Sequence, residues 1–273
     1  MKSIYDKKNL VLQVTQQKCE HFQAGRCTAE FCVCNNYAII WGYILSVVPE
    51  TYQLATLQDF TGMYNGTTVL STSALRKARN QLISYCWKNI AEGEDYDFNT
   101  WSVNTILPHR LKTGSSLVIY GNPWSNEHNS SVKIGKKKIG KTLLASIVMK
   151  EAIFLRHKPE HRVDSYAWTN YKLLCNRLMA NASSGEYEEA IREYYEADWL
   201  VVDQIEPERN SENGRQFRIN VLDQFFLERM EKNLPSILVF QEDISNTVNF
   251  SNEYGSVLYD LVNNRKTHHV TLI

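Results

Sequence analysis

The stretch GKKKIGKT at residues 135–142 runs directly into LLASIVMKEAIFLR at 143–156, and the apolar run SLVIYG precedes it at 116–121. The octapeptide fits the pattern G-x-x-x-x-G-K-[ST] without a mismatch. In this pattern the glycines let backbone N–H groups surround phosphates, the lysine reaches the outer phosphates, and the helix that follows adds its positive N-terminus. The alternative interpretation is a solvated basic turn. The pattern predicts a site for ATP and Mg²⁺ that contains Gly135, Gly140, Lys141, Thr142 and Leu143, with the Thr142 hydroxyl as a magnesium ligand.

The loop between the strand and the lysine is longer than the pattern requires. The strand predicted at 116–121 ends at Gly121, so residues 122–134 are interpreted as an insertion. Four lysines crowd this region, at 133 and 136–138, together with Trp124. Two interpretations stand side by side: a contact with single-stranded DNA assisted by tryptophan stacking, or a solvated turn that shields the nucleotide.

A second nucleotide-related feature lies in ADWLVVDQI at residues 197–205, where Asp203 ends an apolar strand. An acidic residue at such a strand tip commonly helps hold magnesium, so Asp203 is the second predicted magnesium ligand. A glutamate usually follows and activates water, but Gln204 stands here. Glutamine orients water without accepting its proton, so hydrolysis should be slow unless Glu206 takes over that role. The sequence therefore leaves open whether the chain is an efficient ATPase.

Apolar strand-like and amphipathic helix-like segments alternate along the rest of the chain. This alternation predicts an α/β fold with a parallel sheet covered by helices. The apolar stretch at 37–48 is interpreted as a buried helix or strand. Strands are predicted at 116–121, 161–169, 198–205, 235–243 and 268–273, and helices at 72–91, 141–156, 170–194 with an interruption at SSG, 213–233 and 254–264. One side of the helix at 213–233 should carry Phe217, Val221, Leu222, Phe225, Phe226 and Met230.

Four of the six cysteines, Cys19, Cys27, Cys32 and Cys34, fall within 16 residues. Thiolates suit tetrahedral zinc, and a small polar segment without a core of its own needs such a metal to fold. The sequence predicts a zinc-binding module at residues 1–45 before an ATPase domain at 46–273. His21 could replace one cysteine, and an iron–sulfur cluster or free thiols are the alternatives.

Composition limits the class of protein. Lys and Arg together number 30, as do Asp and Glu, so the formal net charge is zero and a uniformly basic nucleic-acid coat is excluded. A hydrophobic content of 43% excludes disorder as the dominant state. Because no apolar run is long enough to cross a bilayer and the N-terminus lacks the features of a secretory signal, a cytoplasmic chain without a membrane contact is expected.

These motifs together resemble a known group of ATPases. SLVIYGNP, GKT-LLASIVMKEA, ADWLVVDQI and LPSILVF, in this order, and the preceding segment VPETYQLATLQDF at 48–60 are similar to AAA+ loaders of replicative helicases of the DnaC/DnaI type and to IstB-type transposition helpers. The resemblance covers residues 47–273. It implies an AAA+ P-loop core without a C-terminal lid domain, a hexameric DnaB-type helicase and single-stranded DNA as partners, and a homo-oligomer in the ATP-bound form. Some loaders also carry an N-terminal zinc module that contacts the helicase.

The resemblance also suggests residue roles. A polar sensor at the tip of the fourth core strand falls on Gln241 by position. The arginine that reaches a neighbouring subunit's nucleotide has its closest match at Asp260, which is not basic; Arg265 is the nearest arginine and Arg229 a second candidate.

Three functions follow as hypotheses. The first is an ATP-binding DNA replication protein that loads a hexameric helicase onto DNA, with weak or slow ATP hydrolysis. The second is an IstB-like, ATP-dependent transposition regulator. The third is an ATP-gated adaptor without significant turnover, because Gln204 allows binding but little hydrolysis.

Overall fold

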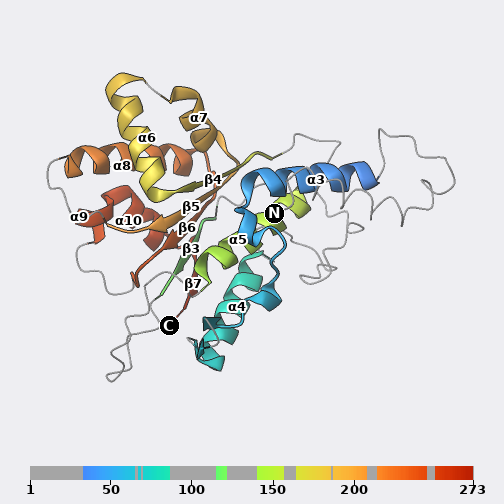
Figure 1. The fold of residues 1–273 in the computed structure, drawn as a ribbon. Coiled ribbons are helices and arrows are strands. Elements are labelled where there is room, and N and C mark those ends of the chain that lie inside the picture. The colour runs from blue at the N-terminus through green and yellow to red at the C-terminus, as the bar shows by residue number, and fades with distance from the viewer. Residues whose placement is uncertain are drawn as a thin grey trace.

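The computed structural model describes residues 33–64, 67–68, 70–86, 115–121, 140–156, 164–185, 187–207, 214–244 and 250–272. A five-stranded sheet forms their centre (Figure 1). All neighbouring strands are parallel, and their order across the sheet is β4-β5-β6-β3-β7. The strands are β3 (Leu117–Tyr120), β4 (Tyr166–Asn170), β5 (Trp199–Ile205), β6 (Ser236–Phe240) and β7 (His268–Thr271). The parallel α/β fold predicted from the sequence is confirmed.

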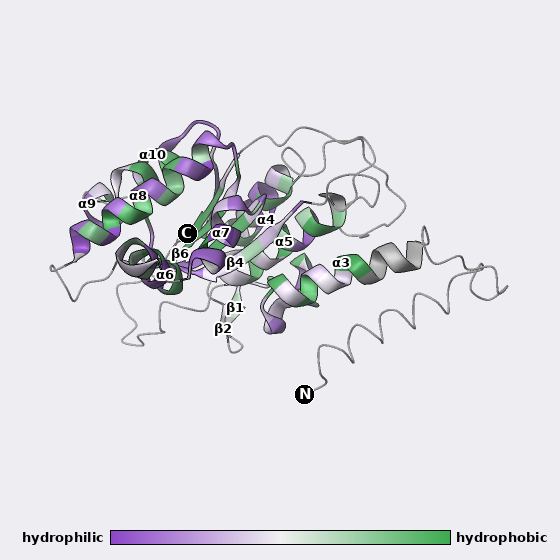
Figure 2. Ribbon diagram, turned by 90° about the horizontal axis from the view of Figure 1, so that it is seen from above, coloured by the Kyte–Doolittle hydropathy of each residue, from purple (hydrophilic) through white to green (hydrophobic). Residues whose placement is uncertain are grey.

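Helices cover both faces of this sheet (Figures 1 and 2). The chain leaves β3 through one helix, passes over β6 and β5 to reach β4, and then returns across the sheet to β7. Because crossovers between parallel strands are right-handed, the outward and return connections place their helices on opposite faces. One face carries α3 (Val33–Val47), α4 (Thr72–Cys86) and α5 (Lys141–Arg156); the other carries α6 (Tyr171–Ser184), α7 (Glu188–Glu196), α8 (Arg215–Glu231), α9 (Phe250–Tyr254) and α10 (Ser256–Asn263).

Side chains that point alternately to the two faces of the sheet divide the core into two layers. In β3, Leu117 and Ile119 pack against the α3–α4–α5 layer, while Val118 and Tyr120 pack against the α6–α10 layer. Successive side chains of a strand point to opposite faces, so a strand covered on both sides is apolar throughout. Figure 2 shows the complementary pattern on the helices, where hydrophobic and hydrophilic residues alternate along α8 and α10.

The predicted face of the 213–233 helix needs correction. Phe217 is 44% exposed, whereas Arg218 and Arg229 of α8 are buried. The Arg229 guanidinium donates hydrogen bonds to the carbonyl oxygens of Tyr194, Ala197 and Pro235, at 2.7–2.9 Å. A buried charged group is tolerated when its hydrogen bonds are satisfied in this way. An analysis of apolar periodicity cannot detect such a residue.

The apolar stretch at 37–48 forms most of helix α3. Ile40, Ile44 and Leu45 belong to the same buried cluster as α5, so this helix is part of the layer that covers the sheet. The predicted boundary between the two domains, between residues 45 and 46, therefore lies within this helix. None of the helices in the described ranges is long and apolar enough to cross a membrane.

The zinc module was predicted on residues that lie mostly outside the described part of the chain. Cys19, Cys27 and Cys32 precede it, and Cys34 is described only as a backbone position in α3. Within the described ranges, no group of three or more His, Cys, Asp or Glu residues is arranged to hold a metal. Zinc at these cysteines therefore stays a prediction. The other two cysteines, Cys86 and Cys175, are free thiols buried in the core.

A short connecting segment joins α3 to α4 and lies over the start of α5. It contains two 3-10 turns, η1 (Glu50–Tyr52) and η2 (Leu57–Asp59), and the two-stranded antiparallel hairpin β1 (Met63–Tyr64) and β2 (Thr67–Thr68). The segment from 49 to 63, here called the lead-in segment, includes most of the VPETYQLATLQDF motif. Neither the turns nor the hairpin has a periodic pattern that would reveal it in the sequence.

Candidate nucleotide-binding site

The candidate site lies at the carboxyl edge of the sheet, where β3 ends and α5 begins. Gly121 closes β3 with a φ of +138°, and Gly140 precedes α5 with a φ of +88°. A side chain is strained at these angles, so glycine is required at both turns. Ligands of open α/β sheets bind outside the carboxyl ends of the strands, beside helix N-termini. Gly135 lies outside the described residues, whereas Leu143 is buried in the first turn of α5 and lines the site.

Lys141 is a cation held between the tips of two strands. Its ammonium group donates hydrogen bonds to the Gly121 carbonyl oxygen at 3.1 Å and to the Gln241 carbonyl oxygen at 2.7 Å. The side chain is only 4% exposed. Burial lowers the pKa of Lys141 to about 8, while the nearby carboxylates of Asp203, Glu242 and Asp243 act in the opposite direction. The charged form of a buried amine is strongly stabilised when an anion approaches it.

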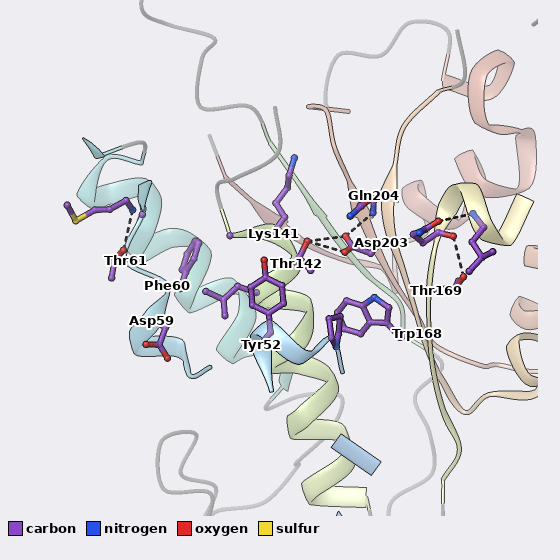
Figure 3. A pocket seen from close by; sticks show the side chains of 17 residues that line it. Tyr52, Asp59, Phe60, Thr61, Lys141, Thr142, Trp168, Thr169, Asp203 and Gln204 are labelled. Atoms are coloured by element: carbon purple, nitrogen blue, oxygen red, sulfur yellow. Dashed lines mark hydrogen bonds between the residues drawn. The ribbon is translucent and has the colours of Figure 1, made fainter. Parts of the chain in front are cut away.

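Thr142 and Asp203 face each other across the site (Figure 3). The Thr142 hydroxyl donates to the Asp203 carboxylate, with Oγ1 at 3.1 Å from Oδ2 and at 3.3 Å from Oδ1. Burial raises the pKa of Asp203, and hydrogen bonds from the Gln204 N–H and the Thr142 hydroxyl, with the charge of Lys141, oppose the rise. One hydroxyl and one carboxylate at this distance form a donor set that Mg²⁺ accepts when phosphate oxygens complete its shell.

A bulge in β5 determines where Asp203 and Gln204 point. The register with β6 pairs Val202 with Leu238 but Ile205 with Phe240, so β5 holds one extra residue. Gln204 adopts a left-handed φ of +59°, and its N–H donates to Asp203 Oδ1 at 2.8 Å. Bulges commonly redirect side chains beside active sites. Because of this one, Asp203 and Gln204 both line the cavity, while Ile205 returns to the core.

The other predicted catalytic residues are distributed differently. Gln241 directly follows β6 and is 7% exposed; within the described part of the chain, its Oε1 has no hydrogen-bond partner. Glu206 is exposed after the buried Ile205 and is not among the residues that line the cavity. Arg265 is exposed in the turn before β7, at the amino edge of the sheet, and therefore away from this chain's own site. Arg229 is unavailable to a neighbouring subunit because its guanidinium is buried and hydrogen-bonded.

A cavity of about 670 Å³ joins this polar group to an aromatic wall. Figure 3 shows the rings of Tyr52, Phe60 and Trp168 around the same cavity as Lys141, Thr142 and Asp203. Its volume lies in the range of small-molecule and cofactor sites. The arrangement offers a cation and a metal-binding pair for phosphates at one end and rings for a flat apolar group at the other.

Sequence reasoning assigned no role to the lining residues from β4 or from the lead-in segment. Asn170 pairs in register with Asp203, which brings the end of β4 to the site. The lead-in segment did carry a signal, since its motif contributed to the resemblance. The unassigned lining residues are Pro49, Tyr52, Asp59, Phe60, Thr61, Gly62, Met63, Trp168, Thr169, Asn170 and Leu173.

Comparison with known proteins places the fold. No protein-family model matches the sequence, and no curated protein matches it by sequence search. The crystal structure of the DnaC helicase loader superposes on 82% of this chain and 100% of its own, with a TM-score of 0.51 and 13% identity. The chain has the fold of the DnaC helicase loader.

Two further solved structures match with lower scores. DnaI covers 83% of this chain and 95% of its own, at a TM-score of 0.45 and 15% identity. The replication initiator DnaA, bound to AMPPCP and single-stranded DNA, covers 83% of this chain and 51% of its own, at 0.45 and 14%. The resemblance to helicase loaders that the motifs carry is confirmed for the fold by the DnaC structure.

Proposed function

We propose that this chain is an ATP-binding AAA+ protein of DNA replication that loads a hexameric ring helicase onto DNA. The fold of the DnaC loader supports the class of protein. The observation that carries the nucleotide assignment is the contact of the Thr142 hydroxyl with Asp203 at 3.1 Å, beside the buried ammonium group of Lys141.

The residues of this site suit a nucleotide with a divalent cation. Thr142 and Asp203 would hold Mg²⁺, which supplies charge neutralisation on the phosphates when it is bound. Lys141 adds a second positive charge in a site that burial shields from water, where such a charge acts strongly. Gly140 lets the backbone approach the phosphates because no Cβ stands in the way.

The same geometry favours binding over turnover. Gln204 occupies the position next to Asp203 from which a glutamate would accept a proton from water, and an amide cannot do so. Gln204 remains suited to orient a water molecule or contact a phosphate, as does Gln241, whose Oε1 has no partner among the described residues. We therefore propose that ATP acts chiefly as an assembly ligand and is hydrolysed slowly.

The partners follow from the proposed class. A DnaB-type helicase, single-stranded DNA and further copies of this chain are the expected ones, with Arg265 as the candidate group that reaches a neighbouring site. The cysteines of the N-terminal segment would hold zinc and form a helicase contact. A second candidate, an ATP-gated adaptor without turnover, is favoured by the amide of Gln204 alone.

The test is co-purification of the chain with candidate ring helicases, with and without Mg²⁺–ATP. A helicase loader should retain the helicase in an ATP-dependent manner and should place it on single-stranded circular DNA. The Lys141→Ala variant is the control, because it should fold but lose both effects. Capture of a transposase in place of a helicase, or capture that ignores ATP and Lys141, would contradict the proposal. Loading of the helicase without any measurable hydrolysis would favour the adaptor.

A further inference from the structure

Two cations hold the main chain of the lead-in segment. Lys150 of α5 is fully buried, and its ammonium group donates to the carbonyl oxygens of Tyr52 at 3.0 Å and of Ala55. A longer contact of 3.5 Å joins it to the Gln53 carbonyl oxygen. Arg79 of α4 donates from Nη2 to the Phe60 carbonyl oxygen at 2.6 Å. Side chains from two helices of the covering layer are therefore hydrogen-bonded to the main chain of the segment near Tyr52 and at Phe60.

The segment depends on these contacts for its position. Neither of its 3-10 turns contains a buried residue. Its buried apolar side chain is Phe60, which follows η2, is 2% exposed and belongs to the core of the α3–α4–α5 layer. Carbonyl groups at the end of a helical turn have no partner within the turn and must be satisfied from outside. Lys150 donates to the carbonyl oxygen of Tyr52, the last residue of η1, and to that of Ala55 just beyond it, and a buried ammonium group in turn needs such acceptors.

These hydrogen bonds engage carbonyl oxygens, so the side chains of the segment form the cavity wall, and the Phe60 side chain also packs into the core. Tyr52 and Phe60 both line the cavity, and Figure 3 shows their rings beside Lys141 and Thr142. The Phe60 ring also lies against the start of α5, since a Cβ added to Gly140 would lie 2.8 Å from it. The aromatic wall and the phosphate end are thus fixed relative to each other through α5.

We propose that Lys150 and Arg79 are positioning residues. They hold the rings of Tyr52 and Phe60, two members of the aromatic wall, in place to receive a nucleobase. This inference rests on the proposed binding of a nucleotide at the site. Aromatic rings bind bases by stacking, whereas phosphates are bound by Lys141, Thr142 and Asp203. Loosening the wall should therefore weaken recognition of the base while the phosphate end stays intact.

The test separates base from phosphate binding. Affinities for Mg²⁺–ATP and for Mg²⁺–tripolyphosphate, which carries phosphates without a base, are measured by titration calorimetry. Lys150→Met and Arg79→Met should each bind Mg²⁺–ATP about tenfold more weakly and tripolyphosphate within about twofold of the parent chain. The matched controls are Lys232→Met, an exposed lysine at the far end of α8, and Arg76→Met, an exposed arginine on the same helix as Arg79. Both should bind as the parent does.

Several results would overturn the inference. Unchanged Mg²⁺–ATP affinity in both variants would show that the wall needs neither cation. Equal losses for the two ligands would show that Lys150 and Arg79 support the phosphate end or the fold as a whole. If Lys150→Met does not fold, as judged by circular dichroism, the half-buried Arg79 carries the test through its own variant. A parent chain that binds neither ligand would refute the proposed function itself, and the inference with it.

Discussion

The Thr142 hydroxyl lies 3.1 Å from the Asp203 carboxylate, although 61 positions separate the two residues in the chain. The first turn of α5 supplies one partner and the bulged tip of β5 supplies the other. Without the bulge, the side chains at the end of β5 would point to the opposite faces of the sheet, because a shift of one residue exchanges the two faces of a strand. The contact between Thr142 and Asp203, the proposed magnesium ligands, is therefore a property of the tertiary fold.

Asp203→Asn tests the metal-binding pair. An amide keeps the size of the side chain and still accepts hydrogen bonds from Thr142 and Gln204, but it removes the charge that Mg²⁺ requires. Affinity for Mg²⁺–ATP should fall by at least about tenfold, while affinity for ATP in the presence of EDTA should not fall, because the lost carboxylate repels metal-free phosphates. Calorimetric titration measures both. Equal affinity for Mg²⁺–ATP in variant and parent would place the metal elsewhere.

The same variant should not destabilise the protein. Burial raises the pKa of Asp203, so at neutral pH the folded chain holds a carboxylate in a place that disfavours its charge. Replacing it with a neutral amide removes that cost. The melting temperature of Asp203→Asn should equal or exceed that of the parent chain, which separates a binding defect from a folding defect.

ATP affinity should depend on pH through Lys141. Its pKa of about 8 in the free site means that the amine is charged below this pH and neutral well above it. Phosphate favours the charged amine, so binding above pH 8 requires proton uptake and weakens by up to about tenfold per pH unit. Calorimetry between about pH 7 and about pH 9.5 should show a flat region followed by a decline. Lys150→Met should retain the decline although Lys150 has a similar pKa, and a flat profile in the parent chain would contradict the assignment to Lys141.

Arg229 should be a stability residue. Lys or Met at this position would leave the carbonyl oxygens of Tyr194, Ala197 and Pro235 without their present donors. Arg229→Met is expected to lower the free energy of unfolding by about 3 kcal/mol. Arg192→Met is the control, since its exposed ion pair with Glu188 should contribute about 0.5 kcal/mol or less. Chemical denaturation measures both, and equal values would show that burial of Arg229 is not what matters.

The N-terminal cysteines are predicted to hold one zinc ion per chain. Elemental analysis of the purified protein should find it, and replacing Cys27 or Cys32 with serine should remove it. Metal-free protein with four reactive thiols in its native state would contradict the prediction. Iron with visible absorbance would instead identify an iron–sulfur cluster.

The sequence predicted those parts of the site that a local pattern encodes. Lys141 and Thr142 lie in one motif, and Asp203 ends an apolar run, so each could be identified without knowledge of the other. The aromatic wall could not be predicted, because Trp168 reaches the site through the pairing of β4 with β5, and Tyr52 through Lys150. Contacts between distant segments leave no periodic signal in the sequence.

The fold shows the same division. The α5 helix begins and ends at the predicted residues, since apolar residues continue through its whole length. The β4 strand begins at Tyr166, five residues after the predicted start at 161, because the sequence HRVDS at 161–165 does not mark where pairing with β5 begins. Strand ends depend on the neighbouring strand, which the sequence alone does not identify.

The last prediction concerns turnover at Gln204. This residue lines the cavity, and its left-handed backbone, at a φ of +59°, holds it at the tip of β5 beside Asp203. A carboxylate placed there could accept a proton from water, and a positioned general base typically contributes a factor of about 10² to 10⁴ in rate. Gln204→Glu should therefore hydrolyse ATP faster than the parent chain, with binding of ATP little changed.

Steady-state release of phosphate measures the rate, and Glu206→Ala is the matched control. Glu206 is exposed and does not line the cavity, so its loss should leave the slow rate unchanged. A parent chain that already hydrolyses ATP rapidly, and that loses the activity in Glu206→Ala but not in Gln204→Ala, would make Glu206 the base. If neither substitution changes the rate, the group that activates water comes from another part of the chain or from a neighbouring subunit, and Gln204 does not limit turnover.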